Sequence, residues 1–435
     1  MRSLTRDRLD DLAQEAGLLV VGVTSAEPFL ETERILIDRI RQGHLAGLTW
    51  FTEERARFSA NPRNLHPQAR SLVSVGLPYR QPDLEPPADG VRRGRISRYA
   101  WGRDYHQTLR ARMERLRALL EAELQRPIDA RFLVDTARIV DRAVAVRAGL
   151  GWYGKNTMVL VPGYGSWVLL GELLVDIELE PDPPLRPRCG RCTTCLQACP
   201  TGALLAPYTL HVPRCISFLT IELRGPIPTE LRPLLGNWVF GCDLCQDTCP
   251  YTAAARPVPD PEVLPERIEH SFPSLEWLLR MTQEEFRQVY RGRAVLRAKR
   301  SGLARNAAVA LGNIGDQTDL ALLEEMLARH DVPLVRGHVA WAMARIDFEA
   351  AARLLESALE REPDPYVRAE IRQALTSPPP HKGQLEEAAH PIPRFGTRRV
   401  SSTCPGGGPD STCLERVDLR GAACRLKDAG GETCS

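Results

Sequence analysis

The sequence predicts an α+β fold in which an α/β domain, a cysteine-rich domain and a block of helices follow one another. Three observations predict it. Helical and strand patterns alternate through the first 180 residues, eight cysteines lie between residues 189 and 249, and a helical pattern recurs every 31 or 32 residues after about residue 301. At 435 residues the chain is too long for one hydrophobic core, so we expect several domains.

The first 180 residues are predicted to form the α/β domain. Apolar residues keep helical spacing over 9–16, and the apolar run 19–23 indicates a buried strand. Further strands are predicted at 96–99, 132–134 and 167–174, and a further helix at 109–124. A proline-rich run from Pro181 to Pro187 ends the domain, because proline removes a backbone donor and interrupts helices and central strands.

Eight of the twelve cysteines form a metal-site pattern. The first four, with the proline after them, fit C-x2-C-x2-C-x3-C-P, in which three thiolates hold one 4Fe-4S cluster and the fourth reaches another. The second four end in the same C-x2-C-x3-C-P half of the pattern. The predicted ligands are Cys189, Cys192, Cys195, Cys199, Cys215, Cys242, Cys245 and Cys249.

This pattern predicts a domain of the bacterial two-cluster ferredoxin type over residues 181–265. By its crossing rule, one cluster takes Cys189, Cys192, Cys195 and Cys249, and the other takes Cys199, Cys215, Cys242 and Cys245. Zinc is the alternative because it also binds paired C-x2-C thiolates, but it does not account for the x3-C-P endings or for eight ligands. We therefore expect a protein that moves single electrons.

Charge and the N-terminus limit the classes of function. The net charge of +2 arises from 57 basic and 55 acidic residues, so any nucleic-acid binding depends on local patches. Acidic residues closely follow the first arginines, and no apolar stretch near them suits a signal peptide or a membrane span. We expect a cytoplasmic protein without membrane contact.

The C-terminal part is predicted to contain HEAT-like α-helical repeats within residues 266–377. Segments 303–307, 334–338 and 366–370 each place an arginine after apolar residues; an irregular helical bundle is the alternative. So few repeats bury little surface alone, and we expect them to dock on the rest of the chain. The glycine- and proline-rich tail 378–435, which holds the other four cysteines, is predicted to be disordered.

Three polar stretches, 96–106, 134–136 and 148–157, lie beside glycines or at the end of an apolar strand, where a backbone can approach a large ligand. Together with 162–167, 215–220 and 305–307, they resemble the epoxyqueuosine reductases, a family of cobalamin-dependent iron-sulfur enzymes. The resemblance covers about residues 5–375.

The resemblance implies a cobalamin-binding catalytic domain over residues 1–180 and reduction of epoxyqueuosine to queuosine at the wobble position of tRNA. Two 4Fe-4S clusters would pass electrons from an external low-potential donor to cobalamin. No histidine is expected as the lower cobalt ligand, so His106 would shape the pocket or pack ordinarily. A dehalogenase-like cobalamin enzyme and a ferredoxin-type electron carrier are the alternatives. We expect a monomer.

Asp135 matches the position of the proton donor in this family. It follows an apolar strand, where burial would raise the pKa of its carboxyl and keep it protonated. A helix cap or turn residue is the alternative. Further candidates for cobalamin or substrate contacts are Arg57, Ser97, Tyr105, Lys155, Asn156 and Ser166.

Four arginines are candidates for tRNA contacts. Arg293, Arg297 and Arg300 are spaced i, i+4 and i+7, which predicts a basic stripe on one helix leading to Arg305. A solvated helix face is the alternative.

Overall fold

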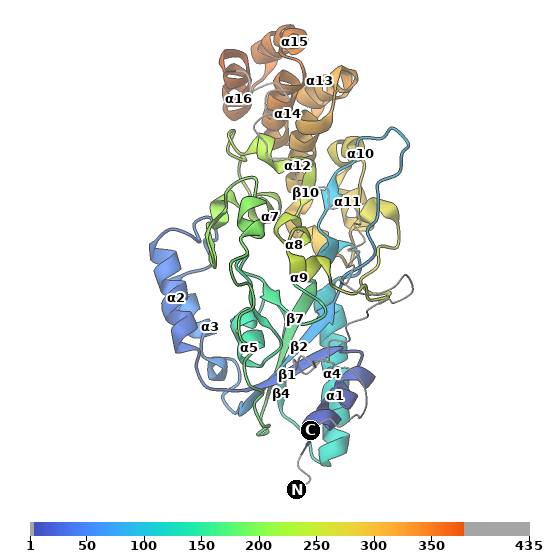
Figure 1. The fold of residues 1–435 in the computed structure, drawn as a ribbon. Coiled ribbons are helices and arrows are strands. Elements are labelled where there is room, and N and C mark those ends of the chain that lie inside the picture. The colour runs from blue at the N-terminus through green and yellow to red at the C-terminus, as the bar shows by residue number, and fades with distance from the viewer. Residues whose placement is uncertain (1–3, 378–435) are drawn as a thin grey trace, which may run out of the picture. The chain divides into compact units, whose positions relative to one another are not determined.

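The computed structural model describes residues 4–377 (Figure 1). Its central element is an antiparallel sheet in the order β1-β2-β7-β4. The strands are β1 (Val20–Ser25), β2 (Ser71–Pro78), β7 (Val168–Val175) and β4 (Ala130–Leu133). The tail 378–435, with its four cysteines and predicted disorder, lies outside the described residues.

Helices cover both faces of this sheet (Figure 1). Side chains alternate between the faces of a strand. Val73 and Leu173 therefore lie in one apolar cluster with α1 and α4, whereas Leu72 and Leu174 lie in another with Val144 of α5. The helices of this part are α1 (Arg6–Glu15), α2 (Leu30–Arg41), α3 (Glu53–Ser59), α4 (Tyr105–Leu124) and α5 (Asp141–Arg147).

Short elements connect the sheet domain to the cysteine-rich segment. β3 (Arg95–Ile96) pairs in parallel with β10 (Trp238–Phe240), which belongs to the cysteine-rich segment. β5 (Trp152–Tyr153) pairs with β6 (Val159–Leu160) within the sheet domain. The strand predicted at 96–99 ends at Ile96, and that prediction was too long. The Ser97 hydroxyl and the Arg98 amide instead bond to the carboxylate of Asp243, and η2 (Arg98–Ala100) follows.

The cysteine-rich segment consists mostly of single-turn helices and short strands. These are α6 (Thr194–Gln197), β8 (Leu204–Ala206), β9 (Thr209–Leu210), α7 (Ile216–Ile221), α8 (Leu244–Asp247) and α9 (Pro250–Ala253). Cys195 lies in α6 and Cys245 in α8, whereas the other six cysteines lie on loops or at the ends of these short elements.

Paired helices form the C-terminal part. They are α10 (Leu275–Arg280), α11 (Gln283–Val289), α12 (Lys299–Ile314), α13 (Leu320–Arg329), α14 (Pro333–Ile346), α15 (Phe348–Arg361) and α16 (Pro365–Thr376). The three predicted repeat segments lie in α12, α14 and α16. The prediction of HEAT-like repeats is confirmed.

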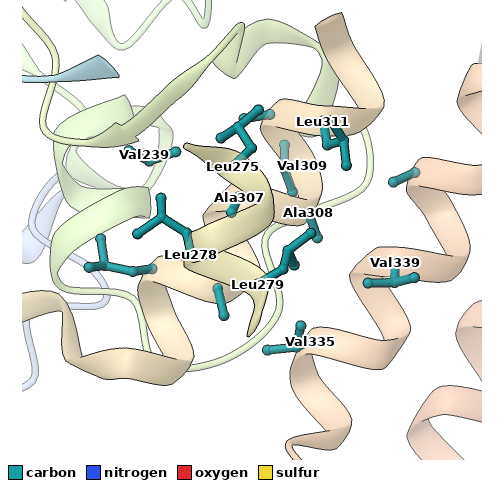
Figure 2. Packing of buried hydrophobic residues seen from close by; sticks show 14 of the residues in the cluster. Val239, Leu275, Leu278, Leu279, Ala307, Ala308, Val309, Leu311, Val335 and Val339 are labelled. Atoms are coloured by element: carbon teal, nitrogen blue, oxygen red, sulfur yellow. The ribbon is translucent and has the colours of Figure 1, made fainter. Parts of the chain in front are cut away.

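The repeats dock on the cysteine-rich segment, as expected from their small number. Val239 of β10 lies in one continuous apolar cluster with Leu275 and Leu278 of α10 and with Ala307 and Leu311 of α12 (Figure 2). All described residues belong to one compact unit, and the predicted domain boundaries stay predictions. Within residues 4–377, no helix is long and apolar enough to cross a membrane.

Candidate functional site

The eight cysteines gather in two sets. Cys189, Cys192, Cys195 and Cys249 line one cavity. Burial and the other three thiols of this set together raise the pKa of Cys195 to about 11. Among residues 4–377, no three His, Cys, Asp or Glu side chains are close enough to hold a single ion.

The second set surrounds Cys245. Burial raises the pKa of this thiol, and Cys215 and Cys199 raise it further. Cys245 and Cys215 likewise raise the pKa of Cys242, so these thiols lie close together. Cys249 thus lies with the first three cysteines and Cys199 with the later ones, which is the arrangement that the crossing rule predicts.

Lys155 and Asn156 lie at these cysteines. The Lys155 ammonium donates to the carbonyls of Gly190 at 2.7 Å and Cys192 at 2.9 Å. The Asn156 amide donates to the carbonyl of Cys245 at 3.2 Å. Two adjacent residues of the sheet domain therefore hold one loop from each cysteine set.

The predicted contacts Ser97 and Ser166 are buried where the sheet domain meets α8. Ser97 donates to Asp243, and Ser166 donates to the Gln246 amide oxygen at 3.0 Å. Arg57 lies elsewhere, 51% exposed in its side chain, and pairs with Glu53 at 2.7 Å.

Asp135 lies in the loop that follows β4. Its backbone has a φ of +41°, and the helix after it begins beyond Val140, so it is not a helix cap. The Tyr105 hydroxyl donates to Asp135 Oδ2 at 2.8 Å, and His106 Nε2 lies 3.5 Å from the same oxygen. His106 Nδ1 donates to Asp104 Oδ1 at 2.8 Å. The first turn of α4 thus brings two proton-bearing groups to one carboxylate.

The electrostatics of this group correct one expectation. Burial raises the pKa of Asp135, but His106, Tyr105 and the charge of Arg142 lower it, and the net pKa is below its ordinary value. Burial alone lowers the pKa of His106, but Asp104 and Asp135 raise it to about 9. The predicted raised pKa of Asp135 was wrong because it considered burial without these partners. At neutral pH the proton lies on His106.

Arg142, on α5, was absent from the predicted site residues. Its charge affects the pKa of both Asp135 and Cys215, and its Nη1 donates to the carbonyl of Thr157 at 3.0 Å. It therefore lies near both the Asp135 loop and the second cysteine set. No motif marks it, because it occupies an ordinary position near the start of a short helix.

A groove with a volume of about 620 Å³ runs along the edge strand β4. His106, Arg110 and Arg131 line it, together with Val134 and Thr136, the two neighbours of Asp135. A large ligand can therefore approach the Asp135 loop from this side.

The basic stripe predicted on one helix is wrong. Arg293 and Arg297 belong to η6 (Ala294–Ala298) and its cap, whereas Arg300 belongs to α12. The backbone of Lys299 between them has a φ of +65°, which breaks a helical course. Arg297 is 48% exposed and paired with Glu222, and it lies near enough for the charge of Asp135 to raise its pKa.

The other three arginines are bonded to groups of the protein itself. Arg293 donates to the carbonyls of Trp101 and Gly102, and Arg300 pairs with Asp331. Arg305 is fully buried, and its guanidinium donates to three backbone carbonyls and to Asn306. Arg305 is therefore a structural residue, and its predicted role as a phosphate contact does not fit the structure.

Family models match three parts of the chain. The model described as epoxyqueuosine reductase QueG, DUF1730, matches residues 60–136. A 4Fe-4S double cluster binding domain matches residues 188–252, and HEAT repeats match residues 274–376.

Curated relatives match most of the chain. Epoxyqueuosine reductase of Bacillus subtilis (strain 168) is 37% identical over 372 residues, which cover 85% of this chain and 95% of the relative. The Escherichia coli (strain K12) enzyme is 38% identical over 334 residues, covering 76% and 86%.

Solved structures agree in fold. An epoxyqueuosine reductase crystal structure aligns with a TM-score of 0.80 at 36% identity, covering 86% of this chain and 99% of the other. A second, with an epoxyqueuosine-modified tRNA-Tyr stem loop, has a TM-score of 0.79 at 36% identity and covers 85% and 97%. A third, from B. subtilis, is described as having its catalytic aspartate loop swung out of the active site; its TM-score is 0.78 at 36% identity, covering 85% and 98%.

Proposed function

The chain belongs to the epoxyqueuosine reductase family, and from this premise we propose that Asp135, held by Tyr105 and His106, delivers a proton to the epoxide oxygen of the substrate. The enzyme is an oxidoreductase that reduces epoxyqueuosine to queuosine in tRNA. Because the chain belongs to this family, the dehalogenase and electron-carrier alternatives no longer apply. The observation that carries the proposal is the Tyr105–Asp135–His106 group beside the groove along β4.

The reaction removes one oxygen atom from the substrate. Two electrons and two protons enter, the carbon–oxygen bonds of the epoxide break, a double bond forms and the oxygen leaves as water. As the first bond breaks, negative charge develops on the oxygen. A positioned acid stabilises that charge by proton transfer. Asp135 and His106 together hold one proton at neutral pH, so we propose that the proton passes from His106 through Asp135 to the oxygen.

We propose that the two cysteine sets hold two 4Fe-4S clusters with the crossed ligands described above. Each set supplies four thiols, and both sets lie within the residues that match a 4Fe-4S double cluster binding domain. Such clusters, when bound, supply electrons singly at low potential. An external donor must reduce them, and its identity and the monomeric state stay predictions.

We propose that cobalamin, which this enzyme family implies, lies between the second cysteine set and Asp135. Arg142 lies near both, so the residues fit a group that joins them. Both ring nitrogens of His106 face carboxylates, so His106 is occupied and unsuited to bind cobalt. Cobalamin would supply the low-potential reduction of the epoxide. The tRNA substrate agrees with the predicted cytoplasmic location.

For the tRNA, we propose that the groove along β4 admits the modified base. Arg110 and Arg131 line it and Arg297 lies near Asp135, so phosphates of the anticodon loop would find positive charge. A base that leaves the stack can then reach the Asp135 carboxylate, whose side chain is 59% exposed.

The test is Asp135→Asn in the reconstituted holoenzyme. The single-turnover rate of oxygen loss, followed by mass spectrometry of digested tRNA, should fall about 10²- to 10⁴-fold, the range that a general acid contributes. Iron content and corrinoid binding should be unchanged, because Asp135 lies outside both cysteine sets.

Asp129→Asn is the matched control. Its side chain, 69% exposed, lies just before β4, and its replacement should leave the rate unchanged. Full activity in Asp135→Asn would exclude it as the proton donor.

A further inference from the structure

Glu172 is a buried acid that the proposed mechanism does not use. It lies on the interior strand β7, opposite Ser74 of β2 and Leu133 of β4, and it is 0% exposed. Neither of its carboxyl oxygens has a hydrogen-bond donor among the described residues. An ionised carboxylate in such a place is costly, because it loses water without gaining a partner.

Asp141 faces Glu172 from α5, which packs on the same side of β7. The two carboxyl groups are within hydrogen-bonding reach, yet Asp141 Oδ1 is also buried without a donor. Two carboxylates cannot bond, since both only accept. A single proton changes this, because a protonated carboxyl donates to its neighbour. The Ser74 hydroxyl, buried and likewise without a partner, is the cross-strand neighbour of Glu172.

The charges around the pair favour a retained proton. Burial, and then the charge of Asp135, raise the pKa of Asp141 to about 7, while burial and Asp141 raise that of Glu172 well above its ordinary value. Arg142 on α5 opposes this for Asp141, but its guanidinium also bonds to the carbonyl of Thr157. Tyr153 on β5, with a pKa raised to about 12, stays neutral.

We propose that Glu172 and Asp141 share one proton and hold it for Asp135, which passes it to the substrate oxygen as that oxygen leaves as water. This rests on the proposed role of Asp135. The reaction then balances within the site: His106 supplies the first proton, the acid pair supplies the second, and two electrons arrive through the clusters. Protons from the solvent then reprotonate His106 and the acid pair. Glu172 and Asp141 act through Asp135, so they are positioning residues.

Glu172→Gln tests the proposal without relying on activity. A glutamine amide donates to Asp141 permanently, so the stored proton is no longer needed. In the wild-type holoenzyme, the raised pKa values mean that the stabilising effect of the protonated pair is fully present near pH 4. It is lost as the pH rises through the raised pKa values of the two carboxyls, about 7 for Asp141. One retained proton changes the unfolding equilibrium about tenfold per pH unit, and the variant should lose this slope.

Infrared spectroscopy gives a second readout. At pH 6 the band of protonated carboxyl groups should be stronger in the wild type than in Glu172→Gln. Asp243, whose pKa is raised to about 6 by burial, contributes equally to both spectra. Glu370→Gln is the matched control, because Glu370 is a buried glutamate that pairs with Arg232 at 2.7 Å. It should lower stability while keeping both the slope and the band. An unchanged slope and band in Glu172→Gln would overturn the shared proton.

The pH profile of single-turnover reduction then tests whether Glu172 and Asp141 pass their proton to Asp135. The wild-type rate should fall as the pH rises through the raised pKa values of the two carboxyls and the pair loses its proton. Glu172→Gln should be slow throughout, by roughly tenfold, which is less than the loss of the acid itself. A wild-type rate and profile in this variant would overturn the proton supply. If Asp135→Asn were active while the slope and band persisted, the role of Asp135 would fail and the shared proton would stand.

Discussion

Two buried polar clusters in this chain differ in how well they are partnered. Arg305 sits where the repeats meet the cysteine-rich segment, and all five of its N–H groups have acceptors. Glu172 and Asp141 sit behind the Asp135 loop, and three of their four oxygens have no donor. Native proteins satisfy buried polar groups where stability is the only requirement, and the exceptions gather at functional sites.

The partnered cluster extends through the repeats. Asn306 donates to the carbonyls of Thr220 and Val239 at 2.8 Å, and Arg232 makes two bonds with Glu370. His338 accepts from the amide of Ile227 at 3.1 Å. These hydrogen bonds hold the repeats in one position against the cysteine-rich segment. We therefore expect substitutions at this junction to lower stability and substitutions at the acid pair to lower activity.

The largest effect on stability should follow from Arg305→Met. The carbonyls of Leu219, Leu223 and Gly225 would stay buried without donors, at a cost of about 3–5 kcal/mol in the free energy of unfolding. Urea denaturation followed by circular dichroism in anaerobic buffer measures it. Arg329→Met, at an exposed position on α13, is the control and should change little. A loss below 1 kcal/mol at Arg305 would break the comparison.

His106→Gln should have an intermediate effect that depends on pH. The pKa of His106 is raised to about 9, so its stabilising effect is fully present below about pH 6.5 and is lost as the pH rises through 9. Allowing for partial exposure, the difference from the wild type should be about 2 kcal/mol at pH 6 and near zero at pH 10. Denaturation at both pH values measures it. A constant difference would exclude the imidazolium–carboxylate pair.

Arg57→Ala should have the smallest effect. Its ion pair with Glu53 is exposed, and such pairs contribute less than about 0.5 kcal/mol. Stability and turnover should both match the wild type, which would remove Arg57 from the predicted site. A large loss of corrinoid binding would instead restore it.

Features encoded by local spacing were predictable from the sequence. The cysteine sets and the repeats follow from intervals along the chain, and both lie in the structure where the spacing indicated. Strand β2 was missing from the predicted strands, although it lies in the centre of the sheet. Every residue from Ser71 to Pro78 is buried, so the strand shows no alternation of polar and apolar side chains.

Features that depend on contacts between distant residues were not predictable. The pKa of Asp135 is set by Tyr105 and His106, thirty and twenty-nine positions earlier in the sequence. The arginine stripe failed because one residue, Lys299, leaves the helical region. Glu172 reads as part of an ordinary strand, and only its register against Ser74 and its contact with α5 reveal the acid pair.

The bonds of Arg305 bear on how far this enzyme can be shortened. α12 belongs to the repeats by its sequence, but it holds the carbonyls of the segment that follows Cys215. A chain that ends after α12 would keep these hydrogen bonds and lose only the helices that follow α12. A chain cut before α12 would lose the donors to the segment that follows Cys215, a proposed ligand of the second cluster. We therefore expect the smallest redox-competent fragment to end within the repeats, beyond the end of the predicted ferredoxin-like segment.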